Sequence, residues 1–166
     1  DRAAVGSFDN EAYWIAPFQD VENRVQLQRL VGTLRSSGGT SILSGMRLVS
    51  ESIILEPAEI KHIILLTDGG ADSAGLVALA EELYTQHQVT LSVISIGVDE
   101  AAFLEQMAEA GRGNYHSIPD ASTIPSIFTL ETVLATRSYI QEQPFTPLVA
   151  APPHPILQGI DGLPSL

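Results

Sequence analysis

The sequence contains no cysteine, which rules out disulfides, thiolate metal sites and a cysteine nucleophile. Basic residues are also scarce, since eight Lys and Arg stand against twenty Asp and Glu and give a net charge of −12. A chain this acidic repels phosphate backbones and anionic lipid headgroups, so nucleic acid and direct membrane-surface binding fit it poorly. The negative charge does not by itself identify a partner, because such charge ordinarily keeps a protein soluble.

Long apolar runs are missing as well. No segment approaches the roughly 18 consecutive apolar residues of a transmembrane helix, and no basic-then-apolar signal segment opens the chain. Apolar residues still make up 45% of the 166 residues, which is ample for the core of one domain. The chain starts at Asp1 rather than at methionine and enters an apolar stretch at once, which indicates a piece of a longer protein.

Two apolar periodicities alternate along the chain. Alternating or continuous apolar runs predict strands at residues 2–8, 12–16, 60–67, 89–98 and 115–118, with a hairpin turn at 9–11. Spacings of three and four residues predict helices, marked by Leu27, Leu30, Val31 and Leu34; Ile42, Met46, Val49 and Ile53; Leu76, Leu79, Ala80 and Leu83; Phe103 and Met107; and Ile124, Ile127, Phe128 and Leu134. This alternation predicts an α/β domain, a mostly parallel sheet with helices on both faces.

Two short motifs could carry chemistry in such a fold. Asp68 follows the predicted strand 60–67 and precedes two glycines, so its carboxylate would lie at the strand's carboxyl end, where open parallel sheets bind ligands. Thr40 follows the run Ser36–Gly39 and offers a hydroxyl at the start of a helix. Each motif alone is weak, because Asp68 can simply fix its loop and Thr40 or Ser41 can simply cap the helix.

Together, four segments resemble consecutive landmarks of the von Willebrand factor type A (vWA) family. They are Asp-Arg-Ala-Ala-Val-Gly-Ser-Phe-Asp, Gly-Gly-Thr-Ser-Ile-Leu, Ile-Ile-Leu-Leu-Thr-Asp-Gly and Leu-Ser-Val-Ile-Ser-Ile-Gly-Val, and their order and spacing match over residues 1 to about 136. The resemblance implies a Rossmann-like fold with a metal-ion-dependent adhesion site (MIDAS). That site combines an Asp-x-Ser-x-Ser loop after the first strand with a threonine and an aspartate, and Thr40 and Asp68 fall on those two positions.

The donor set implied by the resemblance suits Mg²⁺ or another divalent cation. Hydroxyl, carboxylate and water oxygens match this hard ion, which keeps several waters, and a carboxylate from a partner protein can complete its coordination. The chain departs from the family pattern in one respect, since Asp-x-Ser-x-Ser occurs nowhere in it. The resemblance implies that the chain starts at the family's second strand, so the first central strand is absent. Metal binding by Thr40 and Asp68 alone is therefore expected to be weak or absent.

The missing strand would lie between strands 2–8 and 60–67 and would leave two strand edges open. Unpaired edges of interior strands expose rows of amides and carbonyls, so something is expected to fill the gap. Three solutions are open: exchange of a strand with a second copy, insertion of a tail segment such as 148–151, or direct pairing of the flanking strands.

The vWA-like domain is expected to cover residues 1–138, and a proline-rich linker to a following domain is expected over 139–166. Segments of this tail, including Pro-Phe-Thr-Pro at 144–147 and His-Pro-Ile-Leu at 154–157, are similar to the junction in bacterial membrane proteins that join a vWA domain to a glutamine-amidotransferase-like domain. The similarity implies that the parent protein is anchored in a membrane, although this piece would not contact it.

Three functions of different classes are open. The first is metal-mediated protein recognition through Thr40 and Asp68, and the second is a metal-independent assembly or scaffold module. The third, a hydrolase using Asp68, needs a second convergent acid, base or nucleophile, and the sequence offers no convincing one. The four histidines, at 62, 87, 116 and 154, have no metal-ligand spacing and are interpreted as packed or surface residues. A non-enzymatic module is therefore the interpretation favoured by the sequence.

Overall fold

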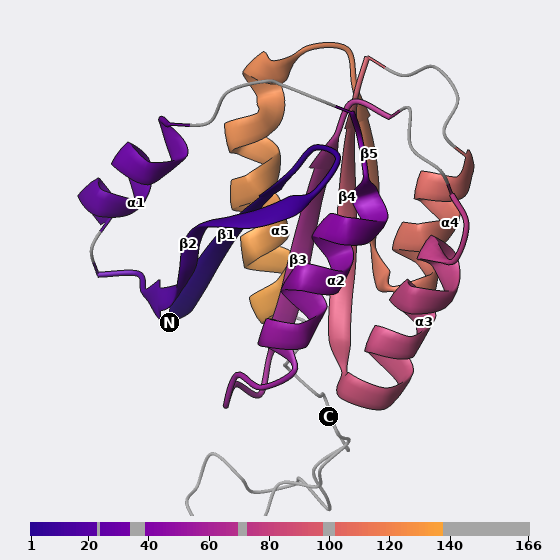
Figure 1. The fold of residues 1–166 in the computed structure, drawn as a ribbon, viewed down its shortest axis with the longest axis horizontal. Helices are drawn as coiled ribbons and strands as arrows, with labels where there is room; N and C mark the ends of the chain where they lie inside the picture. The colour runs from indigo at the N-terminus through magenta and orange to yellow at the C-terminus, as the bar shows by residue number, and fades with distance from the viewer. Residues whose placement is uncertain (23, 34–38, 70–72, 98–101, 138–166) are drawn as a thin grey trace, which may run out of the picture.

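The computed structural model describes residues 1–22, 24–33, 39–69, 73–97 and 102–137. In chain order these form β1 (Arg2–Phe8), β2 (Ala12–Asp20), α1 (Arg24–Val31), α2 (Ile42–Ile53), β3 (Lys61–Thr67), α3 (Leu76–His87), β4 (Val89–Ile96), α4 (Ala102–Ala110), β5 (Arg112–Ile118), a 3₁₀ turn (Ala121–Thr123) and α5 (Ile124–Arg137). Figure 1 shows their arrangement. Within these described ranges, no helix is long and apolar enough to cross a membrane.

The strands β3, β4 and β5 form a parallel sheet in that order. Its central strand β4 is buried nearly throughout, as a strand covered on both faces by helices should be. One face packs against α2, α3 and α4 in a single apolar core, made chiefly of Ile42, Met46, Ile63, Leu65, Leu76, Leu83, Leu91, Val93, Leu104 and Met107. The predicted α/β class, with a parallel sheet and flanking helices, is confirmed.

The opposite face of this sheet carries α5 (Figure 1). Alternation along the strands directs His62, Thr90 and Ser92 away from the apolar core, and Glu131 of α5 reaches Ser92 on this second face. Helices therefore cover both faces, but the two interfaces differ in chemistry. The core face is apolar, whereas the α5 face contains a cluster of polar side chains.

The strands β1 and β2 pair antiparallel as a separate two-stranded sheet. The predicted hairpin is present, but β2 runs to Asp20 instead of ending at residue 16. Pro17 lies in a strand that, among the described residues, pairs with β1 alone, and it stands beside an irregularity in the register. An edge strand tolerates a residue without an N–H, which explains the longer strand.

Direct pairing between β1 and β3, one of the three expected solutions for the sheet gap, is wrong. Among the described residues, β1 pairs only with β2 and β3 only with β4, so the two sheets remain separate. Helix α2 spans both. It contributes Ile42 and Met46 to the core, and a Cβ at its Gly45 would lie 2.6 Å from Cδ1 of Phe8 in β1. The close packing of α2 on the hairpin holds the two sheets together, and the tail at 148–151 lies outside the described residues.

Two further boundaries differ from the sequence-based prediction. The last strand begins at Arg112 instead of Tyr115. Its Gly113 lies so close to the backbone of Leu91 in β4 that no side chain would fit, and the glycine lets the two strands approach each other there. Arg112, the first residue of β5, has a left-handed φ of 54° and places its guanidinium 5.7 Å from the ring centre of Tyr84. The first helix ends at Val31, and Leu34, the last position that the sequence assigned to it, lies outside the described residues.

Candidate functional site at the carboxyl end of the sheet

Asp68 directly follows β3, at the carboxyl end of the parallel sheet. Its side chain is exposed, whereas Thr67 before it is buried and accepts a hydrogen bond at Oγ1 from the amide of Gly69 (3.2 Å). Gly69 has a φ of 84°, a conformation that glycine adopts without strain. The buried threonine and the glycine thus turn the chain sharply, and the carboxylate between them is left accessible to a ligand.

Thr40 directly precedes α2, whose N-terminal cap residue is Ser41. The Ser41 side chain makes no capping hydrogen bond, so its hydroxyl does not cap the helix as the simpler interpretation required. The two neighbours of Thr40 are tied instead to the turn of the hairpin. The amide of Gly39 donates to Oδ1 of Asn10 (3.2 Å), and the amide of Ser41 donates to the carbonyl of Asp9 (2.6 Å).

These two bonds predict that Asn10 positions the Thr40 segment. Replacing Asn10 with alanine should speed hydrogen exchange of the Gly39 amide by about fivefold, because a net hydrogen bond of about 1 kcal/mol corresponds to that factor. The Ser41 amide, which is bonded to backbone, serves as an internal control and should keep its rate. Amide exchange followed by NMR measures both, and equal rates for Gly39 in the two proteins would contradict the prediction.

The two segments meet at the same end of the molecule. Helix α2 begins where β3, β4 and β5 end, at the top of Figure 1. Ser95 is the register partner of Thr67 in β4, and its buried Oγ has no hydrogen-bond partner among the described residues. Asp68 and the Thr40 segment thus lie at this end of the sheet, where Ser95 is fully buried. Binding of a metal by Thr40 and Asp68 stays a prediction.

The donors described at this end of the sheet are oxygen atoms. In the described part of the chain, no group of three or more His, Cys, Asp or Glu side chains is arranged to hold a metal ion. A site there would depend on hydroxyl, carboxylate and water oxygens, which are the donors that Mg²⁺ prefers. The residues present therefore fit part of the implied site chemically, and further oxygen ligands would have to come from outside the described residues.

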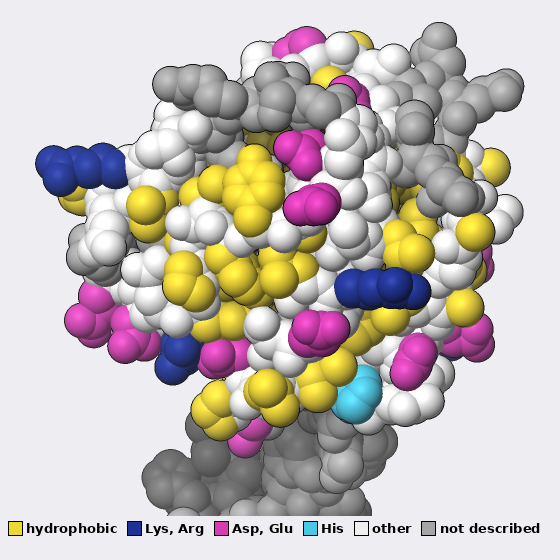
Figure 2. Space-filling model, in the orientation of Figure 1, with side chains coloured by type: hydrophobic (Ala, Val, Ile, Leu, Met, Phe, Trp, Pro, Cys, Tyr) yellow, Lys and Arg dark blue, Asp and Glu magenta, His cyan; other side chains and the backbone are white. Residues whose placement is uncertain are grey.

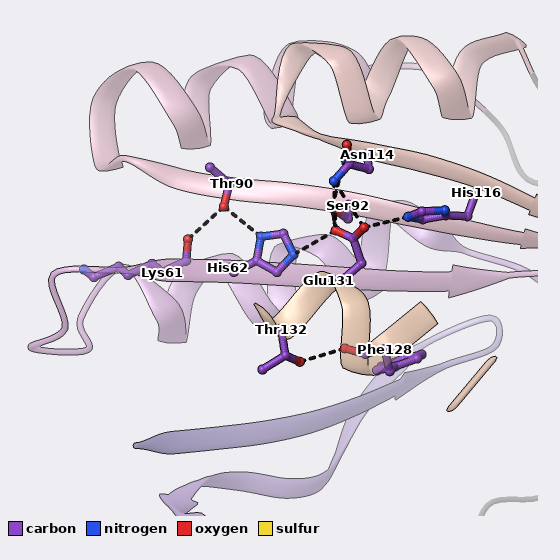
Figure 3. Close-up of polar contacts among 9 residues, drawn as sticks. All are labelled: Lys61, His62, Thr90, Ser92, Asn114, His116, Phe128, Glu131 and Thr132. Carbon is purple, nitrogen blue, oxygen red and sulfur yellow. Dashed lines mark hydrogen bonds and ion pairs between the residues drawn. The ribbon is translucent and has the colours of Figure 1, made fainter. Parts of the chain in front are cut away.

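Sequence reasoning missed a second polar cluster, on the α5 face of the sheet (Figure 3). The side chain of Glu131 is 1% exposed. Its carboxylate accepts hydrogen bonds from Ser92 Oγ, Asn114 Nδ2 (3.1 Å) and His116 Nε2 (2.6 Å), and His62 Nε2 lies 3.8 Å away. A glutamate inside the apolar stripe of a predicted helix was the available signal, since buried glutamates are rare unless they are paired. We call these five residues the Glu131 cluster.

The Glu131 cluster contains Ser, His and Glu but lacks the geometry of a hydrolytic triad. In a triad the histidine lies between the nucleophile and the carboxylate. Here Glu131 lies between Ser92 and His116 and accepts from both, so in the described cluster the histidine does not reach the serine hydroxyl. Ser92 is also fully buried. The cluster therefore offers no support for the hydrolase alternative.

Hydrogen bonding decides the charge state of Glu131. Burial acts to raise the pKa of this carboxyl, but the hydrogen bonds from Ser92, His116 and Asn114 outweigh burial and hold the pKa below its ordinary value of 4.5. Burial lowers the pKa of His62 below 6.5, and the charge of Glu131 opposes this effect only in part. At neutral pH the cluster therefore contains a buried carboxylate beside a neutral histidine.

Comparison with known proteins identifies the family. The model of the von Willebrand factor type A domain family matches residues 2–117, which is more than half of the chain. The chain belongs to the vWA family. A curated relative, an uncharacterized protein from Synechocystis, is 34% identical over 70 residues. That match includes 42% of this chain and 17% of the relative, so the chain spans only a small part of the relative's length.

Solved vWA structures share the fold. A von Willebrand factor type A protein from Catenulispora acidiphila aligns with a TM-score of 0.69 at 26% identity, over 81% of this chain and 33% of its own. The conserved hypothetical protein BatB from Bacteroides thetaiotaomicron aligns with a TM-score of 0.68 at 16% identity, over 82% and 80%. A mussel byssus protein, proximal thread matrix protein 1 with a zinc-occupied MIDAS motif, aligns at 0.62 and 17% identity, over 81% and 34%.

Proposed function

We propose that this vWA domain is a protein-recognition module in which a divalent cation, Mg²⁺ by preference, connects Thr40 and Asp68 to a carboxylate of a partner protein. The observation that carries the proposal is the placement of an exposed carboxylate directly after β3, at the end of the sheet where the Thr40 segment begins α2. The zinc-occupied MIDAS motif of the mussel relative supports metal binding in this fold. A bound cation would supply the positive charge that attracts a partner's Asp or Glu.

The rest of the proposed site lies upstream. We propose that the parent protein has an Asp-x-Ser-x-Ser loop before Asp1, at the end of a strand that fills the space between β1 and β3. The separation of the two sheets supports this view, as does the outer edge of β3, which pairs with no strand in the described ranges. The residues that precede Asp1 in the parent protein test it directly, because they contain the motif or they do not.

Metal titration tests the function. Mn²⁺ replaces Mg²⁺ in oxygen sites and its free ion is counted by electron paramagnetic resonance. The parent protein with its upstream strand should bind one Mn²⁺ in competition with Mg²⁺, and this chain alone should bind it weakly. A parent protein that binds no Mn²⁺ would favour the alternative, a metal-independent assembly module that binds partners by its surface.

The face shown in Figure 2 has apolar side chains gathered near its centre, with charged side chains scattered around them. Acidic side chains are spread over this face, and the chain has a net charge of −12, so an acidic partner would be repelled without a bound metal. The requirement for a cation would then make recognition specific for partners that can offer a carboxylate to it.

The tail motifs at 144–147 and 154–157 support the proposal of a membrane-anchored parent protein that also contains a glutamine-amidotransferase-like domain.

The open edges of β1 and β3 predict self-association of this chain when it is separated from its parent. Two copies can each donate a strand to the other, because the hairpin connects to the remaining fold at one end only. Light scattering after size-exclusion chromatography should show a dimer. A compact monomer at every concentration would reject strand exchange and leave insertion of the tail segment 148–151.

A further inference from the structure

Three hydroxyl side chains lie side by side across the carboxyl end of the parallel sheet. Thr67, Ser95 and Ser117 are register partners in β3, β4 and β5. Because side chains alternate along a strand, Ser95 lies on the same face as Val93 of the apolar core, the face that carries α2, α3 and α4. Neighbouring strands are about 4.8 Å apart, so one small molecule can contact two hydroxyls of this row. Ser117 is exposed, so the row reaches the surface at one end.

Ser95 differs from the other buried hydroxyl residues that the structure describes. The side chains of Ser50, Thr67 and Ser92 each have a hydrogen-bond partner. Ser95 is 0% exposed, and its Oγ has no partner within the described ranges. An unpaired buried hydroxyl destabilises a fold, and alanine would fit the same space without that cost. Such a group is explained most simply by a ligand that completes its hydrogen bonds.

The row of hydroxyls lies next to the residues of the candidate cation site. Thr67 directly precedes Asp68, and its Oγ1 accepts from the amide of Gly69, so its own hydroxyl hydrogen can be donated to a further acceptor. Ile42, the first residue of α2, is buried in the core on the same face as the row. The Thr40 segment therefore begins α2 on this face and at this end of the sheet (Figure 1).

We propose that Ser95 is a positioning residue of the cation site, where its hydroxyl and that of Thr67 hold one water molecule of the bound cation. The inference rests on the proposed function, in which Thr40 and Asp68 bind the cation. Mg²⁺ keeps several of its waters in proteins, so a hydroxyl beneath the site can orient one of them without touching the metal. The Ser95 hydroxyl then gains its hydrogen bond only when the cation is bound, and it destabilises the metal-free protein.

Ser95→Ala tests this role, because it should change cation affinity and stability in opposite directions. In the parent protein with its upstream strand, Mn²⁺ affinity measured by electron paramagnetic resonance should fall by about tenfold, as it does when a group that orients a metal shell is removed. In EDTA, the urea midpoint of the same variant should equal or exceed that of the wild type, because an unpaired buried hydroxyl is gone. A lower midpoint in EDTA would show that the hydroxyl is bonded within the protein and would overturn the proposal.

Ser92→Ala is the matched control, since Ser92 is equally buried in β4 but donates to Glu131 on the opposite face. Its urea midpoint should fall while its Mn²⁺ affinity stays at the wild-type value. Ser95→Thr keeps the hydroxyl on a side chain suited to a strand and should recover most of the affinity. Equal Mn²⁺ affinity in wild type and Ser95→Ala would overturn the role of Ser95 and leave the cation site in place. A wild type that binds no Mn²⁺ would reject the proposed function itself, and this inference with it.

Discussion

Replacing Asp68 with alanine is expected to abolish divalent-cation binding by the parent protein and leave the fold intact. Removal of residues that only orient a metal ligand already costs roughly 10- to 100-fold in affinity, so loss of a ligand should cost more than about a hundredfold. The side chain is exposed and follows β3 without contributing to the core, so stability should change by less than about 0.5 kcal/mol.

Mn²⁺ binding measured by electron paramagnetic resonance, together with thermal unfolding, checks both parts of this expectation. Asp68→Asn keeps the shape and one oxygen but loses the charge, and it should fall between the wild type and Asp68→Ala. Asp20→Ala removes an exposed carboxylate at the end of β2 and serves as the control for net charge. Unchanged Mn²⁺ affinity in Asp68→Ala would show that this residue is not a ligand.

The architecture was predictable because burial of one face of a helix or strand makes apolar residues recur at regular spacing in the sequence. The apolar run 60–67 predicted a strand, and β3 occupies Lys61–Thr67 at the edge of the parallel sheet, whose central strand is β4. The landmark motifs predicted the vWA family, which the family match over residues 2–117 confirms. Local signals of this kind are strong where one residue type must recur along one face.

Features that depend on contacts between distant segments were not predictable. The hydrogen bonds from the amides of Gly39 and Ser41 to the hairpin turn join residues about thirty positions apart, and no local sequence pattern indicates them. His62 and His116 were interpreted as ordinary packed or surface histidines, because their common partner Glu131 lies on a separate helix. Similarly, the direct pairing of β1 with β3 was considered from sequence alone, whereas in the described structure the two sheets are separate and α2 packs against both.

The Glu131 cluster should also contribute strongly to stability at neutral pH. Replacing Glu131 with alanine removes the common acceptor of Ser92, Asn114 and His116 and leaves their polar groups partly or wholly buried without a partner. Breaking a buried charged network by deleting one member costs about 3 to 5 kcal/mol. Because domains of this size are stable by about 5 to 15 kcal/mol, the loss should be evident in urea unfolding followed by circular dichroism.

Two controls decide whether this loss comes from the buried network. Glu82→Ala removes an exposed glutamate from α3 and should change stability by less than about 0.5 kcal/mol. Glu131→Gln keeps the shape and one acceptor oxygen, so its loss should be smaller than that of Glu131→Ala. Hydrogen bonding holds the pKa of Glu131 below 4.5, so the ionised carboxylate stabilises the fold fully above that pH. The difference between wild type and Glu131→Gln should therefore shrink as the pH falls below 4.5, and a difference that stays constant to acid pH would show that the charge of Glu131 does not contribute.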